Sequence, residues 1–187
     1  MEKLYIIILA YLIGSISGSY ILGKAILKID IRNYGSGNAG TTNAMRVMGK
    51  KLGVFVFIID FFKAVACMLI VMKCWGKEYT FLAMIFCSIG HCFPFYMKFK
   101  GGKGVAVTFG SLAVINYQLT AILFLCWVIF ALISKNIGMA SVFMYICAAI
   151  VFCFFGGLVT ADKVLVLLNS TLGILRHESN IRAAFSK

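Results

Sequence analysis

Acidic residues, histidine and proline are scarce in this chain, and their scarcity excludes several kinds of site. Of the 187 residues, only 6 are Asp or Glu, 2 are His and 1 is Pro. The 7 cysteines are scattered, and none belongs to a CxxC spacing. Metal centres need clustered carboxylates, imidazoles or thiolates. We therefore expect no metal, no other cofactor and no disulfide framework.

The signatures of several common enzyme mechanisms are missing as well. The chain has no GxSxG elbow, which would present the nucleophilic serine of a hydrolase. His91 does not begin an HxxxxD acyltransferase pattern, because the fifth residue after it is Tyr96. The Lys100–Gly104 stretch is no Walker A motif, since Val105 stands at the hydroxyl position. An enzyme made from this chain must depend on positioning and electrostatic stabilisation.

Apolar residues, in contrast, are abundant. Hydrophobic residues make up 62% of the chain and charged residues 13%, and the mean hydropathy is +0.99. The apolar residues fall in blocks of roughly 20, the length that crosses a hydrocarbon core of about 30 Å. A soluble domain would carry more polar surface. We expect an all-α fold: a polytopic integral membrane helical bundle, with residues 1–187 forming one transmembrane domain.

Seven membrane spans are expected. Residues 105–133 are too long for one comfortable span, and Asn116, Tyr117 and Gln118 interrupt them, which favours a hairpin of two short helices. In the five-span alternative, this block is one helix and the last two blocks form one broken helix. The expected spans are residues 4–23, 52–72, 79–97, the two halves of 105–133, 138–155 and 164–175.

The basic residues suggest an orientation for these spans. The chain has 18 Lys and Arg and a net charge of +12. Most of these bases share one side if the loops at 24–53 and 98–104, Lys135 and the C-terminal tail lie together. The positive-inside rule makes that side cytoplasmic, with the N-terminus outside. Since the bases lie between apolar blocks, we expect membrane lipid and phosphorylated solutes as partners, and no nucleic acid.

The first polar loop reads NYGSGNAGTTNAMR, residues 33–46, and contains a formal GxGxxG string. A dinucleotide site would need a strand before this string and a βαβ helix after it, and neither is expected beside a membrane span. Glycines still allow successive N–H groups to face one concavity, and an arginine adds phosphate recognition. We expect an anion site; the alternative is a flexible interfacial turn. Its residues are Gly35, Ser36, Gly37, Asn38, Gly40, Thr42, Asn43 and Arg46.

The second polar loop reads GHCFPFYMKFKGGKG, residues 90–104. Its lysines could serve only as a topology signal. Glycines between them weaken that interpretation, because a charge anchor needs no special backbone. His91 lies one turn from the lysines, either as a packed side chain or as a functional group. The residues expected to hold phosphate are Lys100, Gly101, Gly102, Lys103 and Gly104.

Three further features carry expectations. Asp60 and Lys63 are three residues apart on one helix face, so we expect a structural ion pair within the membrane. Small residues at Gly14 and Gly18 predict close helix packing. The tail RHESNIR, which taken alone is a positive-inside anchor, contains His177, Asn180 and Arg182.

Together these motifs resemble the bacterial acyl-phosphate-dependent glycerol-3-phosphate acyltransferases. Asp60 and Lys63 also fit that family. Two departures are visible: Ser17 stands where members usually have proline, and residues 138–141 read GMAS where they often read SLAS, which keeps Ser141. The matching motifs are GSxxxxYxxGK at 14–24, GSGNxGxTNxxR at 35–46, GHxFPxxxxFKGGKGVA at 90–106 and RHxxNIR at 176–182.

The resemblance implies transfer of a fatty acyl group from acyl phosphate to the 1-hydroxyl of sn-glycerol 3-phosphate, at the cytoplasmic face of a bacterial plasma membrane. We expect direct attack by the hydroxyl, whose proton passes to the substrate's phosphate or to His177. Implied catalytic residues are Ser36, Arg46, His91, Lys103, His177 and Asn180. Ser141 and Arg182 join the loop residues above as implied substrate-binding residues.

Two other functions remain open from the sequence. A transporter of a phosphorylated anion would show pseudo-symmetric halves and bases deep in its spans. Here Lys63 is the only base deep in an expected span, and no repeat is evident. A lipid-binding scaffold without catalysis would have no need of the glycines.

Overall fold

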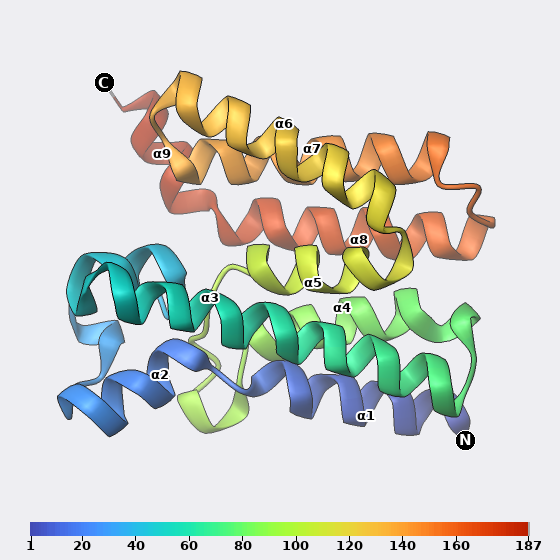
Figure 1. Cartoon of the computed structure of the whole chain (residues 1–187), viewed down its shortest axis with the longest axis horizontal. Helices are drawn as coiled ribbons and strands as arrows, with labels where there is room; N and C mark the ends of the chain where they lie inside the picture. The colour runs from blue at the N-terminus through green and yellow to red at the C-terminus, as the bar shows by residue number, and fades with distance from the viewer. Residues whose placement is uncertain (187) are drawn as a thin grey trace. The chain divides into compact units, whose positions relative to one another are not determined.

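Helices account for almost all regular structure in this protein, a computed structural model of which describes residues 1–186 (Figure 1). No strand occurs within those residues, which confirms the all-α prediction. The chain divides into two units, Met1–Ser111 and a second that begins at Leu112. Each unit is described separately below.

The first unit is a set of long helices with a cluster of short ones at one end. α1 and α4 pack side by side along their length, and α3 lies against both (Figure 1). Short 3-10 and π segments follow α2, precede α4 and lie within the second polar loop. Its elements are α1 (Glu2–Ser15), α2 (Gly18–Leu22), η1 (Gly23–Leu27), η2 (Ile31–Asn33), α3 (Thr41–Cys74), η3 (Lys77–Tyr79), α4 (Thr80–Cys92), η4 (Phe95–Met97) and the start of α5 (Val105–Ile115).

Glycines on both partners permit the close packing of α1 against α4. A Cβ atom at Gly14 of α1 would overlap the carbonyl oxygen of Cys87 on α4. Reciprocally, a Cβ at Gly90 of α4 would overlap the carbonyl oxygen of Tyr11 on α1. Gly18 faces α3, where a Cβ would lie 3.0 Å from that of Ile59. The expected small-residue packing is confirmed, although Gly14 and Gly18 serve different partners.

The first apolar segment is broken at Ile16, between α1 and α2. Backbone groups freed by such a break need partners, because none is supplied by lipid. The Tyr96 hydroxyl donates to the Ser15 carbonyl at 2.8 Å and accepts from the Ser17 amide at 3.1 Å. Ser17 also caps α2, its hydroxyl accepting from the Tyr20 amide. Ser17 therefore supports the break through both its backbone and its side chain.

The helix that follows the first polar loop begins earlier than the sequence indicated. Residues 24–53 were expected to be loop, yet α3 starts at Thr41 and runs for 34 residues. Gly49 interrupts it with a φ of 86°, a conformation that glycine adopts at little cost. Burial of Asn43 and Ala44 favours the helical turn before this interruption. The expectation was wrong for residues 41–48, which form helical turns before the kink although their polar and basic side chains were assigned to the loop.

The second unit contains three long helices and a short one. α6 (Tyr117–Ser134) packs on α7 (Ile137–Phe155), and α7 packs on α8 (Thr160–Arg176), which leads into α9 (Glu178–Phe185) (Figure 1). Asn116 caps α6 by accepting from the Leu119 amide at 3.0 Å, and Asn136 caps α7 in the same way. The predicted interruption at Asn116 is thus confirmed, with α5 and α6 on either side.

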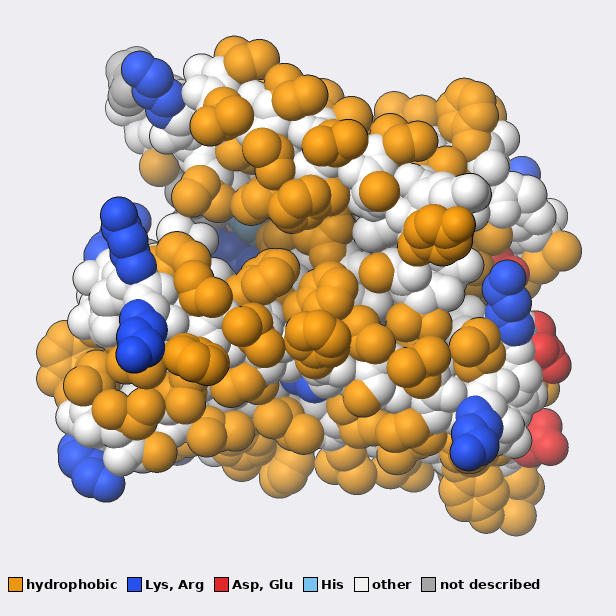
Figure 2. Space-filling model, viewed as in Figure 1, with side chains coloured by type: hydrophobic (Ala, Val, Ile, Leu, Met, Phe, Trp, Pro, Cys, Tyr) orange, Lys and Arg blue, Asp and Glu red, His pale blue; other side chains and the backbone are white. Residues whose placement is uncertain are grey.

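Many large apolar side chains face outward from both units. Examples are Phe62 on α3, Leu132 on α6 and Phe154 on α7, which are 59%, 72% and 79% exposed. Figure 2 shows such side chains over the visible surfaces of α3 and α6. Within residues 1–186, five helical segments have the length and composition to cross a membrane: Glu2–Leu27, Thr41–Cys74, Lys77–Met97, Tyr117–Ser134 and Ile137–Phe155. α5 is a shorter apolar helix, and the number of spans stays a prediction.

Candidate phosphate-binding site

The first polar loop is held in shape by the buried side chain of Asn43. Its amide oxygen accepts from the Ser36 amide at 2.8 Å. Its amide nitrogen donates to the carbonyls of Tyr34 and Ile31, at 3.0 and 3.3 Å. Gly35 has a φ of 61°, and a Cβ there would overlap the Asn43 amide. These contacts describe an ordered loop rather than a flexible turn.

This loop presents its polar groups at the start of α3. Gly40 immediately precedes Thr41, so the first N–H groups of the α3 segment before Gly49 point toward the loop. Arg46 lies little more than one turn further along the same helix and is exposed, as are Ser36 and Thr42. Backbone amides, hydroxyls and a guanidinium in one region match the requirements of a bound phosphate. Asn38 is half-buried, and Gly37 has a φ of 72°.

The second polar loop folds back onto the end of α4. The Gly101 amide donates to the Cys92 carbonyl at 3.0 Å, and the Gly102 amide donates to the His91 carbonyl at 3.1 Å. A Cβ at Gly101 would overlap the same His91 carbonyl. Gly104 has a φ of 87°, which favours glycine. The glycines are therefore required by the fold of this loop, which a plain charge anchor would not explain.

The two loops meet beside the His91 imidazole. A Cβ at Gly102 would overlap Nε2 of His91 and would lie 3.0 Å from the carbonyl oxygen of Ala39 in the first loop. Lys103 is half-buried next to this junction, whereas Lys100 is exposed. Loops that are some 60 residues apart in sequence thus lie in contact, as an anion site built from both would need.

A buried ionic cluster lies behind this junction. Lys63 Nζ is 2.9 Å from Asp60 Oδ1 and 2.9 Å from His91 Nδ1, and it also donates to the Ile16 carbonyl. Asp60 further accepts from the Gly18 amide at 3.4 Å. The Asp60–Lys63 pair was expected, and the contact of His91 with it was not. Helical spacing reveals a pair within one helix, but it carries no information about a partner on α4.

Sequence reasoning also missed Arg32, which was counted only as a base. Arg32 forms an ion pair with Asp30 at 2.6 Å, donates to the Met97 carbonyl and lies over the Tyr20 ring. The Asp30 carboxylate also caps η2. The Arg32 side chain and its hydrogen bonds hold the pKa of Asp30 below its ordinary value. The DxR spacing, in which the acid caps the turn that carries the base, is the signal that could have found the pair.

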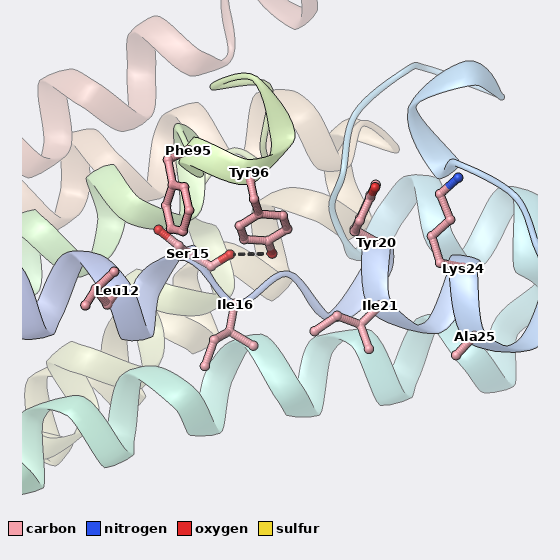
Figure 3. Close-up of a pocket in the computed structure, with 9 residues that line it drawn as sticks. All are labelled: Leu12, Ser15, Ile16, Tyr20, Ile21, Lys24, Ala25, Phe95 and Tyr96. Carbon is pink, nitrogen blue, oxygen red and sulfur yellow. Dashed lines mark hydrogen bonds between the residues drawn. The ribbon is translucent and has the colours of Figure 1, made fainter.

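An apolar groove of about 670 Å³ lies at the break between α1 and α2 (Figure 3). Tyr20 and Tyr96 approach each other edge to face across it, with ring centroids 5.9 Å apart. Lys24 supplies a cation at the end beyond Tyr20 (Figure 3). The groove is lined by Leu12, Ser15, Ile16, Tyr20, Ile21, Lys24, Ala25, Phe95 and Tyr96.

The remaining predicted residues belong to the second unit. His177 lies at the junction of α8 and α9 and is buried, with Nδ1 2.8 Å from the Gly173 carbonyl oxygen. Asn180 packs against Gly138, where a Cβ would overlap its amide. The Ser141 hydroxyl donates to the Ile137 carbonyl and accepts from Trp127, so it braces α7 against α6. Arg182 forms an exposed ion pair with Glu178.

Within residues 1–186, the structure brings no three His, Cys, Asp or Glu side chains into a group that could hold a metal ion.

Comparison with known proteins gives one consistent result. A family model described as glycerol-3-phosphate acyltransferase matches residues 4–187. A protein of that name from Finegoldia magna is 41% identical, over 97% of this chain and 93% of its own length. Its Aquifex aeolicus counterpart is 36% identical, over 97% and 94%.

Solved structures agree with these relatives. Two crystal structures of PlsY (YgiH), an integral membrane glycerol 3-phosphate acyltransferase, are similar to this chain at 34% identity. The glycerol 3-phosphate form has a TM-score of 0.90, and the lysophosphatidic acid form has 0.87. Each comparison covers 98% of this chain and 92% of the other.

Proposed function

The chain belongs to the glycerol-3-phosphate acyltransferase family, and from this premise we propose that it transfers a fatty acyl group from acyl phosphate to the 1-hydroxyl of sn-glycerol 3-phosphate. The products are 1-acyl-sn-glycerol 3-phosphate (lysophosphatidate) and inorganic phosphate. This reaction is the first committed step of phospholipid synthesis. The similar crystal structures are of forms with the acceptor and with the product of such a reaction.

The meeting of the two glycine loops beside His91 is the observation that carries the proposal. Both substrates contain phosphate, and each loop combines glycine amides with a base, Arg46 in the first and Lys103 in the second. Two anion-binding loops in contact would hold two phosphorylated molecules close enough to react. Neither a lipid-binding scaffold nor a charge anchor needs this convergence.

The chemistry follows from the activated donor. Acyl phosphate is a mixed anhydride, so the glycerol hydroxyl attacks the carbonyl carbon directly. The new ester C–O bond forms, the C–O bond to phosphate breaks, and phosphate leaves with the electron pair. The hydroxyl proton passes either to the departing phosphate or to His177. Because Nδ1 of His177 faces a carbonyl oxygen, Nδ1 carries the proton and Nε2 is the basic nitrogen.

Roles for the remaining residues follow from their surroundings. Ser36, Arg46 and Lys103 bind phosphate oxygens, assisted by the glycine amides and Asn38. Asn43 acts by holding the first loop. In the second unit, Ser141 and Asn180 contribute by position, since one braces α7 and the other packs against its first turn. Arg182 attracts phosphorylated substrate as an exposed base.

We place the protein in the bacterial plasma membrane with its polar loops and C-terminus in the cytoplasm, where glycerol phosphate is available. The asymmetry of its basic residues supports this orientation. The acyl chain, being apolar, lies among the helices near the cytoplasmic edge of the bilayer, and the groove beside Tyr20 is suited to it.

The test uses purified protein with acyl phosphate and glycerol 3-phosphate in the absence of coenzyme A. Release of inorganic phosphate together with lysophosphatidate is the expected result. Arg46→Ala should abolish transfer while the protein still inserts into membranes, and Arg46→Lys should retain a fraction of the rate. If the wild type releases neither phosphate nor lysophosphatidate, but labelled glycerol 3-phosphate is taken up into proteoliposomes, the transporter function would be favoured instead.

A further inference from the structure

The Lys63 ammonium group has three N–H bonds, and the structure provides three acceptors for them. These are Oδ1 of Asp60 at 2.9 Å, the carbonyl oxygen of Ile16, and Nδ1 of His91 at 2.9 Å. Asp60 and Lys63 come from α3, Ile16 from the break in the first span, and His91 from α4. Lys63 and both ionisable partners are at most 8% exposed, so the group lies away from solvent.

This arrangement determines where the proton of His91 resides. An ammonium group only donates hydrogen bonds, so Nδ1 of His91 must accept. A neutral imidazole that accepts through Nδ1 carries its proton on Nε2. A proton on both nitrogens would direct a second N–H at the ammonium and would leave an unfavourable net positive charge in a buried site. The charges of Asp60 and Lys63 cancel, so the cluster has no net charge only if His91 is neutral.

The Nε2–H bond of this tautomer points to the junction of the two loops. Gly102 approaches Nε2 so closely that any Cβ would overlap it, and the Ala39 carbonyl oxygen lies 3.0 Å from that same Cβ position. The backbone of His91 also holds the Gly102 amide. The cluster therefore fixes both the ring and the loop that the ring faces.

We propose that Lys63, oriented by Asp60, holds His91 as its Nε2–H tautomer, so that His91 acts as a hydrogen-bond donor and never as the base. Its Nε2–H stabilises the oxygen on which negative charge develops as the acyl carbonyl is attacked. Identification of that oxygen rests on the proposed function, whereas the tautomer does not. Asp60 and Lys63 are positioning residues, and His91 is the group that touches substrate.

His177 provides an internal reference for this assignment. Its Nδ1 faces the Gly173 carbonyl, which can only accept, so its proton lies on Nδ1. The two histidines of the chain thus have opposite tautomers, and only His177 has a basic nitrogen at Nε2. Nε2 of His91 is therefore a hydrogen-bond donor, and Nε2 of His177 is an acceptor.

The first test reads the tautomers directly. Protein labelled with ¹⁵N-histidine is examined by long-range ¹⁵N–¹H correlation in detergent at neutral pH, and His177→Gln leaves a single signal for assignment. We expect Nε2–H for His91 and Nδ1–H for His177. In the Asp60→Asn/Lys63→Met double variant, which removes both charges together, the His91 preference should be lost. An Nδ1–H or doubly protonated His91 in the wild type would overturn the proposal.

The second test separates the two nitrogens by substitution. Glutamine places an N–H donor near the position of Nε2, whereas asparagine reaches only as far as Nδ1. His91→Gln should retain at least tenfold more kcat than His91→Asn, with KM for both substrates nearly unchanged between the two. Equal or reversed kcat values would refute the donor role. If the wild type transfers no acyl group, the proposed function fails, and the labelled spectrum still decides the tautomer.

Discussion

Gly102 is the residue at which the backbone, the imidazole and both loops come closest. Its amide is held by the His91 carbonyl, and its missing side chain leaves room for Nε2 of His91. In the free chain, glycine costs more entropy to order than alanine. Alanine at this position would reduce that entropy cost, but the close approach of Nε2 of His91 to Gly102 leaves no room for its methyl group.

Gly102→Ala should lower kcat by at least 100-fold, because the new methyl group displaces the imidazole from the loop junction. Initial rates of phosphate release measure the effect. His91→Ala/Gly102→Ala is the matched control, since it removes the imidazole that collides. That variant should recover the thermal stability lost in Gly102→Ala and remain inactive. Full activity of Gly102→Ala would show that the close approach is dispensable.

Which residues could be predicted depended on whether their partners are near in sequence. Asp60 and Lys63 share a helix face, and their pairing follows from a spacing of three. His91 was identified as a candidate, but its contact with Lys63 needs the packing of α4 on α3. Arg46 and Lys103 were identified by loop composition. Their proposed binding of phosphate awaits the kinetic tests.

At the scale of elements, α1 and α4 are joined by a reciprocal pair of glycine contacts. Gly14→Ala and Gly90→Ala should each destabilise the protein by about 1–3 kcal/mol, as overpacking of a tight interface does. Ile8→Ala, on the lipid-facing side of α1, is the control and should change stability little. Thermal unfolding in detergent measures all three.

The double variant Gly14→Ala/Gly90→Ala sharpens this test. Once one methyl group has forced α1 and α4 apart, the second meets less resistance, so the combined loss should be smaller than the sum. Strict additivity would mean that the two glycines do not share one interface.

The short η2 element depends on the charge of Asp30, which caps it and pairs with Arg32. Since the folded-state pKa of Asp30 is lowered, its contribution to stability is present above the ordinary pKa near 3.8 and is lost as pH falls through the folded-state value. Asp30→Asn should thus lower Tm by a few degrees at pH 7. As the pH falls below 3.8 and through the folded-state value, the wild-type carboxylate is also protonated and the two Tm values should converge; a difference that stays constant throughout the acid titration would contradict this.

Element boundaries were predictable where a side chain ends a helix and less so where glycine bends one. The interruption at Asn116 followed from a polar run within an apolar block, and Asn116 does cap α6. The early start of α3 did not follow, because the polar and basic residues before Gly49 were assigned to the loop. The break at Ile16 was equally hidden, since its stabilising partners Tyr96 and Lys63 are distant along the chain.

At the scale of the whole molecule, the number of spans and their orientation can be tested by labelling. Residue 135 is cytoplasmic if there are seven spans and external if there are five. Lys135→Cys, in a Cys74→Ser background that removes an exposed thiol, should react with a membrane-impermeant maleimide only after the cells are permeabilised. Tyr117→Cys is the matched variant and should react in intact cells. Reaction of residue 135 in intact cells, with no reaction at residue 117, would establish five spans, because residue 117 would then lie within a span.

The break in the first span has a consequence for the groove beside it. Four backbone groups at the break have side-chain partners: Tyr96 binds the Ser15 carbonyl and the Ser17 amide, Lys63 binds the Ile16 carbonyl, and Asp60 binds the Gly18 amide. Because four of its backbone groups are hydrogen-bonded to side chains of other elements, the break between α1 and α2 is rigid and does not act as a hinge. The walls around Ser15 and Tyr96 therefore keep their shape whether the groove is empty or full, and an apolar chain entering it loses little free energy to reordering of the protein.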